Sequence, residues 1–240
     1  MADSGRDKVA VVTGGNRGIG RGITEALLGD GWRVFLCSRS QGSLDPALAE
    51  LRERFGERVA GRPVDARNQG EVDAFAGWVL QEAGRIDCLV NNAGIGRFGP
   101  VDELTGDQWR EVLQTNLDGC FYFIRAVAPA MKRQGEGWIF NIASLAGKNP
   151  FAGGAAYNAS KFGLIGLSEA AMLDLRQHGV RVAAILPGSV DTGFGQRSDR
   201  KDRSWMLQPE DIASMVLHLL SYPSNALPSL VEMRPSRPPK

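Results

Sequence analysis

The sequence has few cysteines, few histidines and almost no net charge, and each of these shortages excludes a class of protein. Three scattered cysteines, Cys37, Cys88 and Cys120, argue against a disulfide framework and favour a reducing compartment. They form no Cys/His cluster, so no metal site is expected. The formal net charge of +1 provides no strong field to attract nucleic acid or a membrane surface.

Long apolar runs are also missing. No stretch approaches the ~18 apolar residues of a transmembrane helix, and the N-terminal segment lacks the apolar core of a signal peptide. We therefore expect a cytoplasmic protein that binds neither nucleic acid nor a membrane. The length of 240 residues and the 43% hydrophobic content suit a single domain over 1–240 with one sizeable core.

Short β-rich runs alternate with longer helical patterns along the chain. Strands are expected at 8–14, 33–39, 58–65, 86–94, 137–144 and 180–188, with an uncertain seventh strand near 230–234. Helices are expected at 19–31, 44–56, 69–84, 102–134, 152–178 and 209–221. This alternation predicts βαβ units, and hence an α/β fold whose parallel sheet is covered on both faces. The Pro-rich tail at 235–240 is expected to fray.

A glycine-rich segment follows the first expected strand and opens the first helix. It reads TGGNRGIG over 13–20, with Gly14, Gly18 and Gly20 in a GxxxGxG spacing. Glycine permits a tight turn and close approach of the backbone to a ligand, and the helix N-terminus offers free N–H groups to a pyrophosphate. The glycines alone fit a plain strand-to-helix turn equally well, but their place in the first βα unit favours nucleotide binding.

The end of the second expected strand bears on the choice of nucleotide. Folds that bind NAD usually place an acidic residue there for the ribose 2′-hydroxyl, whereas this chain has Ser38 and Arg39. Arg39, together with Arg17 in the glycine segment, could bind a 2′-phosphate, which favours NADP over NAD. The alternative is two solvated surface arginines. Asp65, at the end of the third strand, is either an acceptor for the adenine amino group or a turn residue.

Tyr157 and Lys161 lie four positions apart in an expected helix, with only small residues between them. Residues at this spacing share a helix face, so a phenol and an ammonium group would point into the same space. Taken alone, the pair is more commonly a tyrosine packed on the core and a lysine that reaches water. The rest of the chain decides between these readings.

Several motifs together resemble the short-chain dehydrogenase/reductase family over about residues 8–222. They are TGGNRGIG, NNAG at 91–94, Asn116, Ser144, the Tyr157/Lys161 pair and the Pro-Gly at 187–188. The resemblance implies a single-domain, doubly wound Rossmann-type sheet with strand order 3-2-1-4-5-6-7. It also implies hydride transfer between a nicotinamide and a carbonyl or alcohol carbon. The pattern is most similar to the 3-oxoacyl-carrier-protein reductase-like branch, which uses NADPH.

The resemblance implies a role for each member of a catalytic set. Tyr157 would be the general acid or base, and Lys161 would lower the pKa of its phenol, which is ~10 in free tyrosine. Ser144 would hydrogen-bond the substrate oxygen. Asn116 would hold a water that links Lys161 to solvent.

The resemblance also implies a set of residues that bind NADP(H). They are Gly14, Asn16, Arg17, Gly18, Ile19, Gly20, Ser38, Arg39, Asp65, Asn91, Ala93, Gly94, Tyr157, Lys161, Pro187, Gly188, Val190 and Thr192. Within this set, residues 187–192 would close over the nicotinamide. The partner would be a small carbonyl or alcohol substrate. Two alternatives stay open: an NAD-linked alcohol dehydrogenase of the same family, and a non-catalytic sensor or scaffold that binds NADP.

The segment 189–208 occupies the place of the family's substrate loop. It is rich in charged residues, including Arg197, Arg200, Lys201 and Arg203, and is either a lid for an acidic substrate or, as we favour, a solvated loop. Apolar residues either line a substrate pocket or serve loop packing; they are Phe98, Phe151, Phe194, Trp205 and Met206. Small residues on the later helices allow close packing between subunits, so a homodimer or homotetramer is expected.

Overall fold

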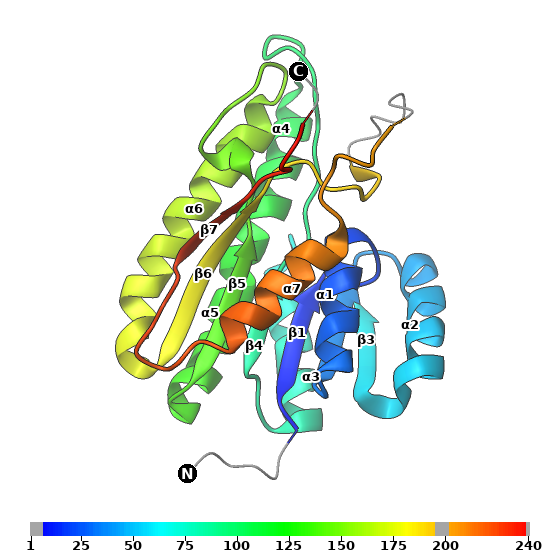
Figure 1. Ribbon diagram of the computed structural model, residues 1–240, viewed down its shortest axis with the longest axis vertical. Coiled ribbons are helices and arrows are strands. Elements are labelled where there is room, and N and C mark those ends of the chain that lie inside the picture. Colours follow the sequence, from blue (N-terminus) through cyan, green and yellow to red (C-terminus); the bar gives the residue numbers. More distant parts are fainter. Residues whose placement is uncertain (1–6, 195–201, 239–240) are drawn as a thin grey trace.

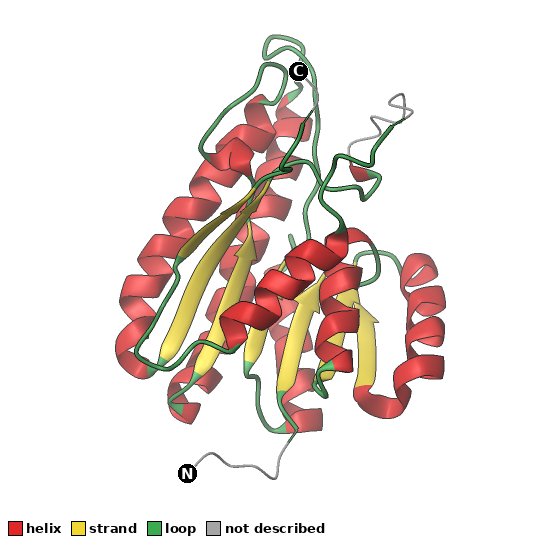
Figure 2. Ribbon diagram, in the orientation of Figure 1, coloured by secondary structure: helices red, strands yellow, loops and turns green. Residues whose placement is uncertain are grey.

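A seven-stranded parallel sheet forms the centre of the protein in the computed structural model, which describes residues 7–194 and 202–238 (Figures 1 and 2). The strands are β1 (Val9–Thr13), β2 (Arg33–Ser38), β3 (Val59–Pro63), β4 (Cys88–Asn91), β5 (Gly137–Ile142), β6 (Val180–Pro187) and β7 (Leu230–Met233). The helices are α1 (Gly18–Gly29), α2 (Gln41–Phe55), α3 (Gln69–Ala83), α4 (Gly106–Leu113), α5 (Gly119–Gln134), α6 (Ala155–Leu175) and α7 (Pro209–Leu220).

The strand order is β3-β2-β1-β4-β5-β6-β7, as predicted from the family resemblance. Every neighbouring pair of strands is parallel. The order reverses direction between β1 and β4, and in open α/β sheets a ligand binds beside the carboxyl ends of the strands at such a switch point. The topology therefore places a binding site above β1 and β4.

Two apolar layers join the sheet to its helices. One face packs against α1, α2 and α7 through residues such as Leu27, Leu48 and Val216, and the other packs against α3, α5 and α6 through residues such as Phe75, Phe123 and Leu175. In Figure 1, α1 and α7 lie side by side across one face of the sheet. Because both faces are covered, inner strands such as β1 and β4 are apolar without alternation.

The region expected to be helical over 102–134 differs from the prediction in two ways. The helix begins at Gly106, because Thr105 and Gln108 form a reciprocal capping box at its start. A π-helical turn, Gln114–Asp118, then separates α4 from α5. Turns of this kind are frequent at functional sites, and this one contains Asn116. The strand expected at 86–94 is also shorter, since β4 ends at Asn91.

The uncertain seventh strand is present. β7 runs parallel to β6, with Ala184 paired to Leu230 and Pro187 paired to Met233. Beyond it, Pro235 lies close to Gly188, so the expected fraying does not begin at residue 235. Residues 239–240 of the tail lie outside the described residues.

No helix in the described ranges is long and apolar enough to span a membrane. Among the residues that the structure describes, no group of three or more His, Cys, Asp or Glu side chains could hold a metal ion. All three cysteines are free and buried.

Candidate active site

The glycine segment forms a tight loop between β1 and α1. Gly14 and Gly18 have φ of 63° and 54°, which disfavours any other residue there. A Cβ at Gly20 would lie 2.2 Å from the carbonyl oxygen of Gly14, so the loop closes on itself only because this residue has no side chain. Ile19 contributes to the core cluster beneath the loop.

The N-terminus of α1 is arranged for an anion. Its N-cap residue, Arg17, makes no side-chain capping hydrogen bond, and the first turn carries no acidic residue. The helices α2 and α6 share this feature, whereas α3 and α4 are capped by the side chains of Asn68 and Thr105. The first-turn N–H groups of α1 therefore have no competing side-chain acceptor at the N-cap, as a bound pyrophosphate would require.

Two residues that the sequence reasoning missed hold this loop against β4. The side-chain amide of Asn92 donates to the carbonyl oxygens of Thr13 and Gly14, at 2.9 and 3.2 Å. The hydroxyl of Thr13 accepts hydrogen bonds from the backbone N–H groups of Asn92 and Ala93, both at 2.9 Å. The signal was present, because Asn92 belongs to the NNAG motif and Thr13 begins the glycine motif.

The side chain of Asn91 is held by its neighbours in the protein core. Its side chain is buried, and its amide donates to the side-chain oxygen of Asn141 on β5 at 2.9 Å. Asn141 in turn donates to the hydroxyl of Ser168 on α6. Only the backbone at Asn91, Ala93 and Gly94 thus fits the predicted approach to a ribose, and its contact with a cofactor stays a prediction.

A charged cluster surrounds the ends of β2 and β3. Glu111 on α4 is paired with Arg97 at 2.7 Å, with Arg39 at 3.5 Å and with Arg67 at 3.9 Å. Arg67, which the sequence reasoning missed, also grips both carboxylate oxygens of Asp65. Its hydrogen bonds hold the pKa of Asp65 below its usual value. Three guanidinium groups and two carboxylates leave the cluster with a net positive charge, which suits a phosphate group.

The neighbouring predicted residues lie around this cluster. Ser38 donates through its hydroxyl to the carbonyl oxygen of Ser40. The side chain of Arg39 is 60% exposed, so it is accessible to a ligand. Asn16 donates through its side-chain amide to Ser43, to both its carbonyl and its hydroxyl oxygen. These residues line one end of the site without being locked into the core.

Tyr157, Ser144 and Lys161 lie together at the carboxyl ends of β5 and β6, as predicted. The side chain of Ser144 lies close enough to the Tyr157 phenol to lower its pKa. The ammonium of Lys161 lies 5.7 Å from the centre of the Tyr157 ring and donates to the carbonyl oxygen of Ile142 at 2.8 Å. The helical spacing of four residues therefore does direct both groups into one space.

The electrostatics of this group differ from the prediction. Burial raises the pKa of Tyr157, and the hydrogen bond from Ser144 opposes this effect only in part. Burial also lowers the pKa of Lys161 to about 8. The expected lowering of the tyrosine pKa by Lys161 is thus wrong in this structure, because desolvation disfavours the charged form of both groups.

Asn116 is buried in the π-helical turn and its side chain is fully used. Its side-chain oxygen accepts from the N–H of Ile95 at 2.8 Å, and its amide donates to the Ile95 carbonyl at 2.9 Å and to the hydroxyl of Ser160 at 3.0 Å. These bonds anchor the loop after β4 to α6. This anchoring was not predicted, and the water-holding role stays a prediction that the side-chain amide has little capacity to fill.

The segment after β6 lies beside the glycine loop. Thr192 is close to Gly18, where a Cβ would come within 3.2 Å of the Thr192 Cβ. Val190 forms a parallel bridge with Leu207, which ties the two ends of the substrate loop together. Pro187 is buried and the N–H of Gly188 donates to Met233. Residues 187–192 thus extend from the sheet toward the glycine loop, as a cover over the site requires.

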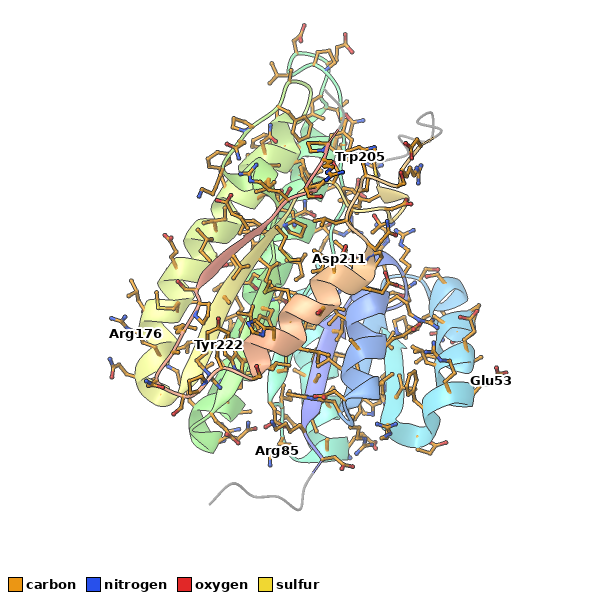
Figure 3. The ribbon with its side chains drawn as sticks, viewed as in Figure 1. Glu53, Arg85, Arg176, Trp205, Asp211 and Tyr222 are labelled. Carbon is orange, nitrogen blue, oxygen red and sulfur yellow. The ribbon has the colours of Figure 1, made fainter. Side chains whose placement is uncertain are left out.

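Part of the predicted substrate loop is not described. Arg197, Arg200 and Lys201 lie outside the described residues. Arg203 is described and pairs with Asp191 at 2.9 Å. Trp205 lies just before α7, whose first turn is marked by Asp211 in Figure 3.

Three phenylalanines surround the ring of Tyr157. The ring centres of Phe98, Phe194 and Phe151 lie 5.7, 5.8 and 6.4 Å from that of Tyr157. The sequence reasoning could not decide between a pocket and loop packing for these residues. The structure brings these three together around Tyr157.

The fold and the site together define a class. A doubly wound parallel sheet with an uncapped glycine loop after β1 is the dinucleotide-binding Rossmann type. Tyr157, Ser144 and the buried Lys161, which lie together at the end of β5, are groups able to transfer a proton to or from a reacting oxygen. The class is therefore a dinucleotide-dependent oxidoreductase.

Comparison with known proteins agrees with this class. A family model described as short chain dehydrogenase matches residues 8–203. A protein of Streptomyces coelicolor, which carries the provisional name ketoacyl reductase, is 36% identical over 235 residues and covers 89% of this chain and 90% of its own. The chain belongs to the short-chain dehydrogenase family and is an oxidoreductase.

Solved structures show the same likeness. A metagenomic short-chain oxidoreductase in complex with NADP is 39% identical, with a TM-score of 0.85 and coverage of 97% of this chain and 99% of its own. An alcohol dehydrogenase from the archaeon Thermococcus sibiricus, complexed with 5-hydroxy-NADP, is 30% identical, with a TM-score of 0.89 and coverage of 98% and 100%.

Proposed function

We propose that this protein is an NADPH-dependent reductase that converts a carbonyl group to an alcohol, with Tyr157 as the proton donor. The observation that carries the proposal is the position of Lys161, which is buried with its ammonium 5.7 Å from the centre of the Tyr157 ring. In the overall reaction, the carbonyl compound, NADPH and a proton give the alcohol and NADP⁺. The bound nicotinamide would supply the hydride that the carbonyl carbon accepts.

The residues of the chain supply the proton and position the oxygen. The raised pKa of Tyr157 keeps its phenol protonated at neutral pH, which is the form a general acid needs for reduction. Ser144 can donate to the same substrate oxygen as negative charge develops on it. Lys161, with a pKa of about 8, holds a proton at neutral pH and can release it readily, so it is suited to restore the proton that Tyr157 loses.

NADP(H) fits the residues present. The uncapped N-terminus of α1 would hold the pyrophosphate, and the positive cluster with Arg39 at the end of β2 would hold the 2′-phosphate. Solved relatives in complex with NADP or 5-hydroxy-NADP support the same choice. An NAD-linked alcohol dehydrogenase is the second candidate, but no carboxylate occupies the ribose position at Ser38 or Arg39.

A non-catalytic sensor is less well supported. Burying a lysine disfavours its charged form, as the lowered pKa of Lys161 shows. A protein that only binds a nucleotide has no need to retain such a group beside a tyrosine and a serine. The ketoacyl reductase-like branch stays a proposal of the sequence, for which the provisional name of one relative is the support.

The test compares the wild type with Tyr157→Phe on a broad panel of ketones, aldehydes and β-ketoacyl thioesters with NADPH or NADH. We expect the variant to lose about 10²- to 10⁴-fold in kcat, the usual contribution of a general acid, while the Kd for NADPH measured by fluorescence changes less than about threefold. Tyr222→Phe, at the far end of α7 (Figure 3), is the control for loss of a phenol hydroxyl. Full activity of Tyr157→Phe would refute the role of Tyr157, and tight NADPH binding without turnover of any compound would support the sensor.

We also propose a homo-oligomer in a reducing, cytoplasmic setting. Exposed aromatic side chains on α5 and α6, Phe121 and Phe162, are each 46% exposed and offer apolar surface for a second copy. The three cysteines are free, and burial raises the pKa of each thiol, as expected for structural cysteines kept reduced. Light scattering on the purified protein would test the oligomer, and a monomer at micromolar concentration would contradict it.

A further inference from the structure

Three aromatic rings from three separate loops converge on the proposed proton donor. Phe98 follows β4, Phe151 follows β5 and Phe194 follows β6, so all three come from the carboxyl end of the sheet (Figure 1). Each is exposed, at 39%, 39% and 47%. Ring centres 5.7–6.4 Å from that of Tyr157 are within the range of favourable aromatic contacts. Aromatic surface is thus accessible beside the reacting hydroxyl.

Two of these rings are held over glycines. A Cβ at Gly96 would lie 2.4 Å from the ring of Phe98, and a Cβ at Gly154 would lie 2.6 Å from the ring of Phe151. Each ring therefore packs directly on the backbone of its glycine, and a larger residue at that position would displace the ring. The rings are 5.9 Å apart from each other, centre to centre. Their position depends on the two glycines as well as on the rings themselves.

The two loops that carry these rings are also joined to each other and to α6. The N–H of Gly99 donates to the carbonyl of Gly153 at 2.9 Å. The side-chain amide of Asn158, next to Tyr157, donates to the carbonyl of Phe151 at 2.9 Å. These hydrogen bonds fix the loops of Phe98 and Phe151 relative to Tyr157.

The described cations of the same three loops are already paired with carboxylates. Arg97 pairs with Glu111, Lys148 pairs with Glu232 and Arg203 pairs with Asp191, at 2.7, 2.5 and 2.9 Å. Within the part of the chain that the structure describes, these loops thus present rings rather than unpaired positive charge to a substrate.

We propose, on the basis of the proposed reductase function, that the substrate carries an aromatic ring directly beside its carbonyl group. The ring would pack among Phe98, Phe151 and Phe194 while the carbonyl oxygen meets Tyr157 and Ser144. Open-chain acyl compounds are disfavoured, because they offer no ring to the cluster. In the reaction the carbonyl carbon gains the hydride from NADPH and its oxygen gains the proton of Tyr157.

The experiment compares kcat/KM for phenylpropanedione, for an open-chain diketone of the same carbon number and for acetoacetate, all with NADPH. We expect the wild type to prefer the phenyl compound at least about 10-fold over either of the others. Phe98→Leu and Phe151→Leu keep apolar volume but lose the ring, and should lower kcat/KM for the phenyl compound by about 3- to 10-fold, the worth of an aromatic contact. The open-chain compound should change less than about twofold.

Gly96→Ala is the decisive variant, because it leaves Phe98 in the chain but displaces its ring. It should reproduce the effect of Phe98→Leu. Leu173→Ala, which removes an exposed apolar side chain about 24 Å along α6 from Tyr157 at 1.5 Å per residue, should leave the ratio between the substrates unchanged. Thermal unfolding of each variant checks that it is folded.

Binding measured without turnover separates this proposal from the proposed function. Saturation-transfer NMR of phenylpropanedione with the protein and NADP⁺ should show contact with the ring protons that weakens in Phe98→Leu and Gly96→Ala. Ring-dependent binding without reduction would overturn the reductase function and support the ring-binding site. Reduction with equal preference for open-chain compounds, or with equal effects of the Phe variants on all substrates, would overturn the ring-binding site and leave the reductase function intact.

Discussion

The buried ammonium of Lys161 predicts an unusual dependence of stability on pH. The side chain is only 5% exposed, and its pKa falls from 10.5 to about 8 on folding. Between those two values the unfolded chain binds more protons at this residue than the folded chain does, so stability rises with pH. Below about pH 8 both states hold the proton, and Lys161 contributes no slope.

The magnitude follows from the two pKa values. At 1.36 kcal/mol per pH unit, the full interval is worth about 3 kcal/mol, of which about 2–3 kcal/mol falls between pH 7 and pH 10. Lys161→Met removes the titrating group and therefore this gain. The absolute change at pH 7 is a weaker test, because the variant also loses the hydrogen bond to Ile142, worth about 1.5–3 kcal/mol for a charged donor.

The assay is urea unfolding of the wild type and Lys161→Met at several pH values from 7 to 10. The stability of the variant minus that of the wild type should fall by about 2–3 kcal/mol across this range, because only the wild type gains. Taking the difference cancels the other titrating groups that the two proteins share. The exposed Lys132→Met controls for the loss of one lysine. A difference that stays constant with pH, or a change as large in the control, would refute the argument that burial lowers the pKa of Lys161.

Two further predictions concern the cofactor site. Arg39→Asp should raise KM for NADPH about 10- to 100-fold relative to NADH, since a charge-assisted bond worth about 1.5–3 kcal/mol is lost and a carboxylate repels the phosphate; an unchanged ratio in steady-state kinetics would exclude Arg39 as the phosphate ligand. Gly20→Ala should weaken NADPH binding at least about 10-fold in a fluorescence titration, because the added Cβ would lie 2.2 Å from the carbonyl oxygen of Gly14. Each kcal/mol of strain in the loop would lower the affinity about fivefold. Gly29→Ala in the same helix, where nothing lies within 4 Å of the added Cβ, should leave binding unchanged, and equal effects of the two substitutions would contradict the steric argument.

The fold could be predicted closely from local patterns. Alternating apolar strands and helical segments predict a parallel sheet, and the family resemblance supplies its order, which the structure confirms. Errors were confined to the ends of elements and to the π-helical turn around Asn116, whose geometry depends on bonds to Ile95 and Ser160 from other elements. The seventh strand was uncertain because the C-terminal segment departs from the pattern common in the family, and the structure shows it paired with β6.

The candidate site likewise has parts that the sequence predicts and parts that only the structure shows. The glycine loop and the Tyr157/Lys161 spacing are visible in the sequence, because a helix turn and a positive φ are local requirements. Residues that support the site from a distance were missed, among them Asn92 beneath the glycine loop and Arg67 beside Asp65. Each acts through a partner whose position is known only when β1, β3, β4 and their loops are assembled.

The sequence alone therefore determined which chemical groups reach the carboxyl edge of the sheet, because strand and helix periods are properties of neighbouring residues. Tertiary structure alone decided how those groups behave. The pKa of Tyr157 rises instead of falling because desolvation is summed over every element packed around it. Phe98, Phe151 and Phe194 become one aromatic surface because three loops far apart in the chain end at the same place.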